Sequence, residues 1–161
     1  MVAAAWWFRH QSRALVRRLA DPRWRLVLAV SPDAGLLDPW WPGGDRIPQG
    51  RGDLGDRMGR VLRRFAPAPV LIVGADVPGI GRAEVAACLA LLAEAPGLVL
   101  GPSEDGGYWA VGLRGPVPRG LFDGVRWSTV HALADTVATL PVGSLVRYGP
   151  TLRDVDEAGD L

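Results

Sequence analysis

The stretch that decides the fold is residues 70–80, which read VLIVGADVPGI. Val70 to Gly74 is the strongest strand signal in the chain, because a short run of aliphatic residues bounded by Pro69 and Gly74 is typical of a strand buried on both faces. Asp76 follows this strand directly. The pattern therefore predicts a buried strand that delivers a carboxylate to the edge of a sheet.

Outward from this strand, expected helices and strands alternate along the chain. The helices are expected at residues 4–20, 53–65, 82–95 and 128–140, the last with Ser128 as its N-cap, and the other strands at 25–30, 98–101, 108–113 and 144–148. Residues 31–52 carry five Gly and four Pro and are predicted to be a loop. This alternation predicts one α/β domain over residues 1–161, with a mostly parallel sheet.

The composition is that of a packed domain with one unusual feature. The chain has 161 residues, 48% of them hydrophobic, and all 18 basic residues are arginines. Because lysine is absent, a P-loop, pyridoxal phosphate chemistry and a Schiff-base aldolase are excluded. The single cysteine, Cys88, excludes a disulfide framework, a CxxC redox pair and a structural zinc site.

Charge and hydropathy point to a small-molecule partner and a cytoplasmic protein. The net charge of +1 at pH 7 predicts no attraction to nucleic acid or to a membrane surface. The longest apolar run, Ala86 to Ala93, is far shorter than the roughly 20 residues of a membrane span. The N-terminus places apolar residues before its charges, the reverse of a signal peptide. The oligomeric state is left open.

Carboxylates follow three of the predicted strands. Asp76 comes after residues 70–74, Asp105 after 98–101, and Asp154 with Asp156 after 144–148. In an open α/β sheet the ligand crevice lies outside the carboxyl ends of the strands, so these acids are expected to converge. A single Asp after a strand is most often a turn residue, but three in corresponding positions favour a site for Mg²⁺ or Mn²⁺, which prefer oxygen ligands.

Two further groups of residues have both a structural and a functional interpretation. In the structural interpretation Gly106 and Gly107 form a tight turn. In the functional interpretation they allow backbone N–H groups to approach a substrate. Trp127 packs in the core in one and stacks on a sugar or base in the other. Arg57 belongs to a row of arginines typical of a solvated helix face, although its place next to a Gly-rich loop favours phosphate binding. The two histidines receive no role.

The motifs, taken in order, resemble a bacterial family of glycosyltransferase-A-like (GT-A) proteins of unknown function, described as radical-SAM or selenodomain-associated transferases. The motifs are QGRGDLGDRM (49–58), GADVPGI (74–80), GPSEDGGYWAVGL (101–113), LFDGVRWST (121–129) and LRDVDEAGDL (152–161). The family is similar in fold to nucleotide-diphospho-sugar transferases and to guanylyltransferases that act on phospholactate or phosphoenolpyruvate. The resemblance implies a three-layer, Rossmann-like sheet of the GT-A type.

The resemblance also implies a role for each matching residue. Asp76 corresponds to the catalytic metal ligand at the end of the central strand, and Asp154 with Asp156 completes the metal site. The residues that the resemblance implies to bind the nucleotide are Gln49, Gly50 and Gly52. Asp53 and Arg57, which follow this loop, are predicted to bind the nucleotide as well. The acceptor side is implied to consist of Asp105, predicted to be catalytic, together with Gly106, Gly107 and Tyr108. Trp127 is predicted to bind the substrate as well.

One departure concerns the beginning of the chain. Members of the family open with a strand and a Gly-rich basic loop that holds the donor phosphates, whereas the first helix of this chain corresponds to the helix after that loop. We expect an N-terminally truncated form of the fold, which arises from a start codon assigned too far downstream or from a degenerate copy. The intact downstream motifs favour the first explanation.

These observations predict a metal-dependent transferase that uses a nucleotide-activated donor, foremost a glycosyltransferase using a nucleotide-diphospho-sugar. One alternative is a guanylyltransferase-like nucleotidyltransferase acting on a small phosphorylated acid. A second alternative is a non-catalytic nucleotide-binding or interaction protein. A Ser-His-Asp hydrolase and a dinucleotide-dependent oxidoreductase are disfavoured, because neither GxSxG nor GxGxxG occurs in the expected context.

Overall fold

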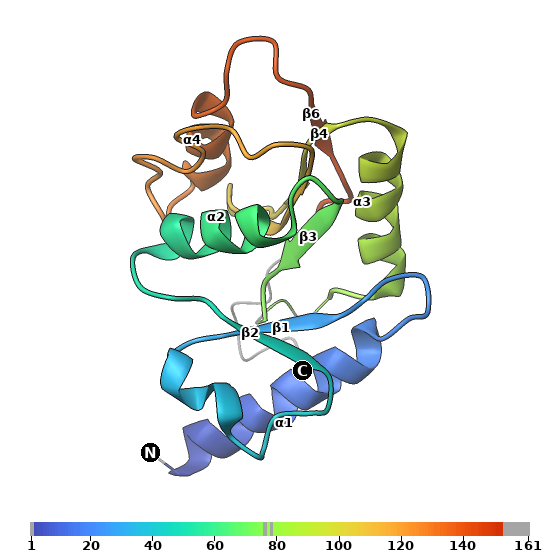
Figure 1. Ribbon diagram of the computed structural model, residues 1–161, viewed down its shortest axis with the longest axis vertical. Helices are drawn as coiled ribbons and strands as arrows, with labels where there is room; N and C mark the ends of the chain where they lie inside the picture. The colour runs from blue at the N-terminus through green and yellow to red at the C-terminus, as the bar shows by residue number, and fades with distance from the viewer. Residues whose placement is uncertain (1, 76, 78, 153–161) are drawn as a thin grey trace. The chain divides into compact units, whose positions relative to one another are not determined.

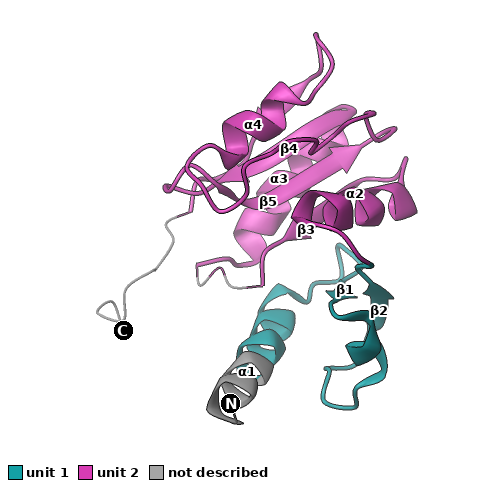
Figure 2. Ribbon diagram, turned by 90° about the vertical axis from the view of Figure 1, so that its left-hand side faces the viewer, with its two compact units in different colours: residues 1–50 teal, residues 51–161 magenta. Residues whose placement is uncertain are grey.

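The computed structural model describes residues 2–75, 77 and 79–152. The chain forms two compact units, unit 1 over residues 1–50 and unit 2 over residues 51–161, which are coloured separately in Figure 2. The prediction of a single domain over residues 1–161 stays a prediction. No helix in the described part of the chain is both long enough and apolar enough to cross a membrane.

Unit 1 consists of a long helix and a two-stranded parallel sheet. Its elements are α1 (Val2–Leu19), β1 (Val27–Val30), the short 3₁₀ helix η1 (Asp33–Leu37) and β2 (Asp45–Pro48). β1 and β2 pair in parallel, with Val27 opposite Asp45 and Val30 opposite Pro48.

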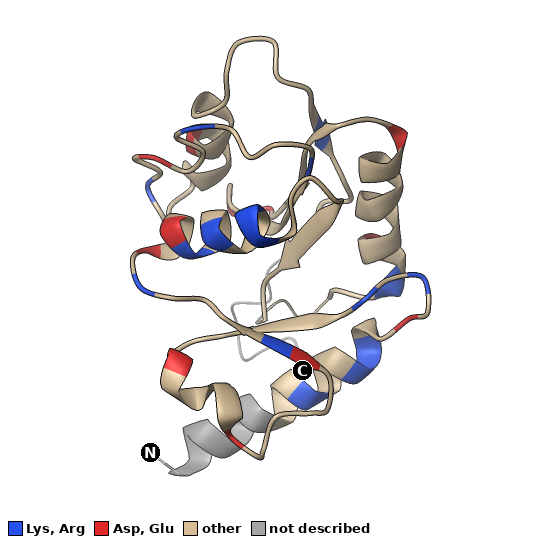
Figure 3. Ribbon diagram, in the orientation of Figure 1, with Lys and Arg blue, Asp and Glu red and all other residues tan. Residues whose placement is uncertain are grey.

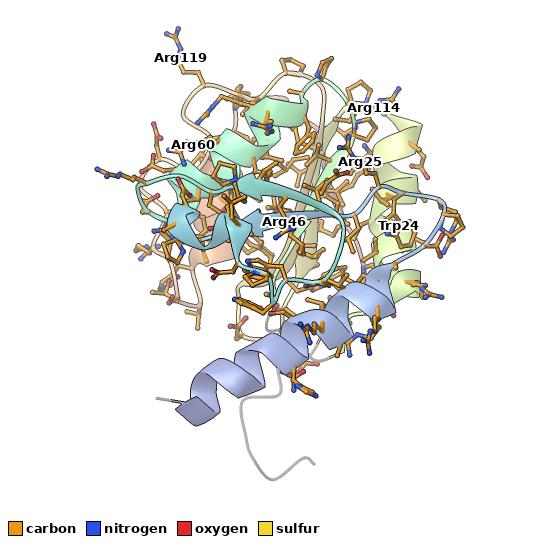
Figure 4. All side chains as sticks on the ribbon, turned by 60° about the horizontal axis from the view of Figure 1, so that its bottom comes forward. Trp24, Arg25, Arg46, Arg60, Arg114 and Arg119 are labelled. Atoms are coloured by element: carbon orange, nitrogen blue, oxygen red, sulfur yellow. The ribbon has the colours of Figure 1, made fainter. Side chains whose placement is uncertain are left out.

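The prediction that residues 31–52 are a loop is therefore wrong in part. The sequence DRIP of β2 is short and has a single buried residue, Ile47, so it carries almost no strand signal by itself. Pairing with β1 makes it a strand. The connection is held by side chains that bond the backbone: the Trp41 indole donates to the Gly35 carbonyl at 2.8 Å, and Arg46, labelled in Figure 4, donates to the Leu36 carbonyl at 3.1 Å.

Unit 2 is built around a four-stranded mixed sheet (Figure 1). The strands lie in the order β3 (Val70–Val73), β5 (Tyr108–Arg114), β4 (Gly97–Pro102) and β6 (Val146–Tyr148). β5 is antiparallel to both β3 and β4, and β4 is parallel to β6. It follows that β3, β4 and β6 run in the same direction, so that their carboxyl ends lie at the same end of the sheet.

Helices cover both faces of this sheet. The main core joins α2 (Leu54–Phe65) and α4 (Ala132–Ala138) to one face, through the buried residues Met58, Leu62, Leu98, Leu100, Val111, Leu113, Leu121, Phe122, Val125 and Ala132. α3 (Arg82–Glu94) contacts β3, β4 and β5, and buries Val85, Cys88 and Leu92. A Cβ on Gly112 of β5 would lie 2.8 Å from Leu92 Cδ1, so α3 packs closely on the other face.

The start of α2 agrees with the sequence and the start of α4 does not. Asp53 is the N-cap of α2, in a capping box with Asp56. Ser128 does not cap α4, which begins at Ala132 after His131. Ser128 instead has a φ of 58°, in the left-handed region, while Asp135 on α4 accepts the backbone N–H of Arg126 at 3.1 Å. The turn is thus defined by contacts that the sequence pattern does not show.

Candidate functional site

The three parallel strands of unit 2 bring distant parts of the chain to the same end of the sheet, where their carboxyl ends lie. β3 ends at Val73, β4 at Pro102 and β6 at Tyr148. The chain after β6 continues alongside the chain after β4, because Leu152 forms a parallel bridge with Ser103. The Leu152 N–H donates to the Pro102 carbonyl at 3.0 Å, and the Glu104 N–H donates to the Leu152 carbonyl at 3.2 Å.

The sequence predicts that the acids of the metal and acceptor sites lie at this end of the sheet. Asp105 lies two residues after Ser103, and Asp154 lies two residues after its partner Leu152. Asp76 lies three residues after the end of β3. Asp76, Asp154 and Asp156 fall outside the described residues, so the three-acid metal site stays a prediction. Within the described residues, no three His, Cys, Asp or Glu side chains are grouped closely enough to hold a metal ion.

The loop that carries Asp105 forms hydrogen bonds within itself, and it contacts the start of α4 and the residues just before it. Asp105 Oδ1 accepts the Gly107 N–H at 2.8 Å, and the Gly106 N–H donates to the Ser103 carbonyl at 3.2 Å. Gly106 has a φ of 86° and lies directly against the backbone of Val130, so a Cβ at this position has no room. The Leu133 N–H donates to the Gly106 carbonyl at 3.2 Å. Asp105 is itself exposed, so the closely packed loop presents its carboxylate to solvent.

Tyr108 and Trp127, two predicted acceptor-side residues, lie next to each other. Their ring centroids are 6.4 Å apart in an edge-on arrangement, and the Tyr108 hydroxyl hydrogen-bonds the Thr136 hydroxyl at 3.1 Å. Burial raises the pKa of Tyr108 to about 12, and the Thr136 hydrogen bond only partly offsets this effect. Tyr108 is therefore a neutral hydroxyl at any physiological pH.

Trp127 also packs against the first turn of α2. A Cβ on Gly55 would lie 3.0 Å from Trp127 Cζ2, 2.8 Å from Phe122 Cβ and 3.3 Å from Asp53 Oδ1. The Trp127 indole N–H is buried and has no hydrogen-bond partner among the described residues. The structure thus brings Asp53, Tyr108 and Trp127 into one neighbourhood of unit 2.

The predicted nucleotide-binding residues are divided between the two units. In unit 1, the Gln49 side-chain amide donates to the Ala29 carbonyl at 2.8 Å, and the Gly50 N–H donates to Asp33 Oδ1 at 2.9 Å. In unit 2, Arg57 Nε donates to the Gly52 carbonyl at 3.0 Å. Gly52 has a φ of 105°, which a residue with a side chain rarely adopts.

Two features of unit 2 have no counterpart in the sequence prediction. Arg126 forms a bidentate ion pair with Asp135. The side-chain hydrogen bonds of Arg126, and after them its backbone N–H, lower the pKa of Asp135 to about 2. An open hollow of about 390 Å³ lies beside Asp135 and contains none of the predicted site residues. Its lining consists of Gly120, Asp123, Gly124, Asp135, Ala138 and Thr139.

Cys88 has the properties of a structural residue. Its thiol is buried on α3, against the backbone of Gly149. Burial first, and the negative charge of Glu84 second, raise the pKa of Cys88 to about 11. The thiolate form that a nucleophile or a metal ligand needs is therefore suppressed.

Comparison with known proteins gives two matches. A family described as "Uncharacterized protein conserved in bacteria (DUF2064)" matches residues 14–129. Among solved structures, a proposed nucleotide-diphospho-sugar transferase from Desulfovibrio desulfuricans G20 shares 25% identity and a TM-score of 0.74, over 95% of this chain and 70% of that chain. None of the curated proteins matches the sequence. The structural likeness confirms the predicted α/β fold of the nucleotide-diphospho-sugar transferase type.

Proposed function

The chain belongs to the bacterial family DUF2064, and from this premise we propose that it is a metal-dependent transferase that takes a nucleotide-diphospho-sugar as its donor. The observation that carries the proposal is the common direction of β3, β4 and β6, each of which is followed by an acid of the predicted site. The pairing of Leu152 with Ser103 adds support, because it brings the chain that leads to Asp154 beside the chain that leads to Asp105.

In this proposal the acids divide into two roles. Asp76, Asp154 and Asp156 would hold Mg²⁺ or Mn²⁺, since carboxylate oxygens suit both ions. The bound ion would neutralise the charge that develops on the departing nucleoside diphosphate. Asp105 Oδ1 accepts the Gly107 N–H. Oδ2 is therefore the oxygen proposed to accept a hydrogen bond from the hydroxyl of the acceptor substrate and to orient this hydroxyl toward the anomeric carbon.

The remaining predicted residues would position the two substrates. Gln49, Gly50, Gly52, Asp53 and Arg57 are proposed to contact the nucleotide, with Arg57 offering a charged donor to phosphate oxygens. Tyr108 and Trp127 are proposed to form an aromatic wall on the acceptor side, where a sugar ring can pack. The hydroxyl of Tyr108 serves there as a neutral hydrogen-bonding group, because its pKa is about 12.

Nucleotide binding tests this proposal directly. Nucleoside diphosphate sugars are screened by thermal shift with and without Mn²⁺, because a ligand that binds only the folded state raises the melting temperature. We expect a stabilising shift that requires both nucleotide and metal. Calorimetry of Asp76→Ala should show at least about a tenfold loss of affinity in Mn²⁺, which corresponds to about 1.4 kcal/mol.

The matched control is Asp123→Ala, which removes an exposed acid of unit 2 that follows none of the three parallel strands. This variant should bind the nucleotide like the unmodified protein. Unchanged affinity of Asp76→Ala would remove Asp76 from the site. The absence of a shift with every nucleotide would favour a non-catalytic role for the chain.

A further inference from the structure

Tyr108 of β5 and Thr136 of α4 share one hydrogen bond inside unit 2, whose elements are labelled in Figure 2. Their hydroxyl oxygens lie 3.1 Å apart. Each hydroxyl carries one hydrogen, so only one of the two hydrogens can lie between the oxygens. Thr136 is 0% exposed, and within the described part of the chain its hydroxyl has no hydrogen-bonding partner besides Tyr108. The surroundings of Thr136 therefore decide which hydroxyl donates.

The buried hydroxyl of Thr136 is the donor of this pair. If Tyr108 donated to Thr136, the Thr136 hydrogen would be buried without an acceptor, which is unfavourable. The opposite direction has no such cost, because a phenol oxygen can accept while its own hydrogen points elsewhere. That hydrogen is present at any physiological pH, since the pKa of Tyr108 is about 12. It follows that the Tyr108 hydrogen is directed away from Thr136.

The Tyr108 hydroxyl is one of two neighbouring donors that lack an acceptor among the described residues. It forms no second hydrogen bond there, and the indole N–H of Trp127, whose ring meets that of Tyr108 edge-on, is buried and forms none. The backbone N–H groups of Gly106 and Gly107, in contrast, are both used within their own loop. The unused groups of this neighbourhood are donors, so they suit a ligand oxygen that carries no hydrogen.

We propose that Thr136 is a positioning residue, which donates to the Tyr108 oxygen and thereby presents the Tyr108 hydrogen to a carboxylate or phosphate oxygen of the acceptor substrate. This inference rests on the proposed function, in which Tyr108 lies on the acceptor side. Carboxylate and phosphate oxygens accept hydrogen bonds without donating, and so match a donor that is held in one direction. The acceptor substrate is thus a molecule that carries an oxyanion as well as the hydroxyl that reacts.

Two substitutions of Thr136 separate the hydrogen bond from packing. Thr136→Val keeps the shape of the side chain and removes the donor, whereas Thr136→Ser keeps the donor and removes a methyl group. The positioning role requires serine to preserve the direction of the Tyr108 hydroxyl and valine to lose it. Tyr148→Phe is introduced into every protein, because it makes Tyr108 the only tyrosine of the chain and changes a side chain that is 52% exposed.

Ultraviolet resonance Raman spectroscopy of the full chain reads the direction of this hydrogen bond, because the intensity ratio of the tyrosine doublet differs between a phenol that accepts and one that only donates. We expect an accepting Tyr108 with threonine or serine at position 136, and loss of the accepting signature in Thr136→Val. Circular dichroism checks folding, and the spectrum with threonine decides the direction even if the valine variant does not fold. A Tyr108 that only donates, or an unchanged spectrum in a folded Thr136→Val, overturns the role of Thr136.

Acetate and inorganic phosphate are the probes of the oxyanion, and they distinguish a carboxylate from a phosphate. We expect titration with one of them to shift the doublet toward a donating phenol, with at least about tenfold weaker affinity in Thr136→Val than in Thr136→Ser. No shift with either probe, or equal affinity in the two variants, overturns the proposal. Neither measurement includes a nucleotide or a metal, so its outcome is distinguishable from that of the thermal-shift test of the proposed function.

Discussion

Asp135 is a residue of α4 that holds the segment before this helix through hydrogen bonds to Arg126. Arg126 donates to it three times, from its backbone N–H at 3.1 Å and from Nε and Nη2 at 2.8 Å each. Trp127 is the next residue in the chain. The ion pair therefore joins α4 to the segment that carries Trp127, and so helps to place this ring beside Tyr108.

The lowered pKa of Asp135 gives this pair a predictable pH dependence. The pKa is about 2 in the folded protein, against an ordinary value of 3.8. A carboxyl whose pKa is lowered by folding stabilises the protein above its unfolded-state pKa, and loses this contribution as the pH falls toward the folded-state pKa. We predict that Arg126→Gln lowers the free energy of unfolding at pH 7, and that this loss disappears between about pH 4 and pH 2.

Urea unfolding of both proteins at several pH values measures this difference. The matched control is Arg119→Gln, because the Arg119 side chain extends away from the rest of its unit (Figure 4). This control should cost little at any pH. An Arg126→Gln deficit that is the same at pH 2 and pH 7 would show that packing, and not the charge of Asp135, is responsible for it.

At the scale of the element, α2 contains two buried glycines with opposite expectations. The nearest atoms to a Cβ on Gly59 belong to the tip of the Arg63 side chain, at 3.3 Å, and this tip can move. Figure 3 marks the charged positions of α2 along the ribbon. Gly59→Ala should therefore stabilise the protein by about 0.5–1 kcal/mol, as expected for a helix interior. Gly55→Ala should destabilise it by about 1–3 kcal/mol, because the new methyl group meets Phe122 and Trp127.

Denaturant unfolding of the two variants provides the measurement, and each variant serves as the control for the other. Equal effects of both substitutions would mean that helix propensity alone decides and that Trp127 does not pack on α2 as described. A destabilised Gly55→Ala that also loses nucleotide binding would link this packing to the proposed site.

The elements that the sequence predicted well are those with a local cause. Asp53 begins α2 because its side chain and that of Asp56 bond each other's backbone, which a pattern of adjacent residues reveals. The apolar strand at residues 70–73 is visible for the same reason. β2 and the antiparallel direction of β5 are not, because both depend on which strand lies beside them.

The candidate site divides in the same way. Sequence motifs indicated Asp105, Tyr108 and Trp127, and the structure brings Tyr108 and Trp127 together. The sequence does not indicate Thr136, which hydrogen-bonds the Tyr108 hydroxyl, because a threonine inside a helix carries no local signal for a partner 28 positions away. The sequence predicts Ser128 as a helix cap because serine favours caps, but Ser128 has a left-handed φ, and the contact of Arg126 with Asp135 on α4 holds the turn before the helix.

At the scale of the whole molecule, the division into two units falls within the predicted nucleotide-binding motif. Unit 1 ends at Gly50 and unit 2 begins at Arg51, so Gln49 belongs to one unit and Asp53 to the other. Boundaries between compact units are where few contacts cross and where proteases cut most readily. Arg51 is exposed, and the next residue, Gly52, has the left-handed φ typical of an irregular connection.

We therefore predict that brief digestion with trypsin first cleaves the bond between Arg51 and Gly52. Mass spectrometry should find fragments 1–51 and 52–161, and Arg51→Gln should abolish this pair of fragments while leaving later cuts in place. Arg119 is the internal comparison, because it is also exposed but lies inside unit 2, and it should be cut later. A first cut inside unit 2, or resistance of Arg51 while both units are degraded, would favour the single cooperative domain that the sequence predicts over residues 1–161.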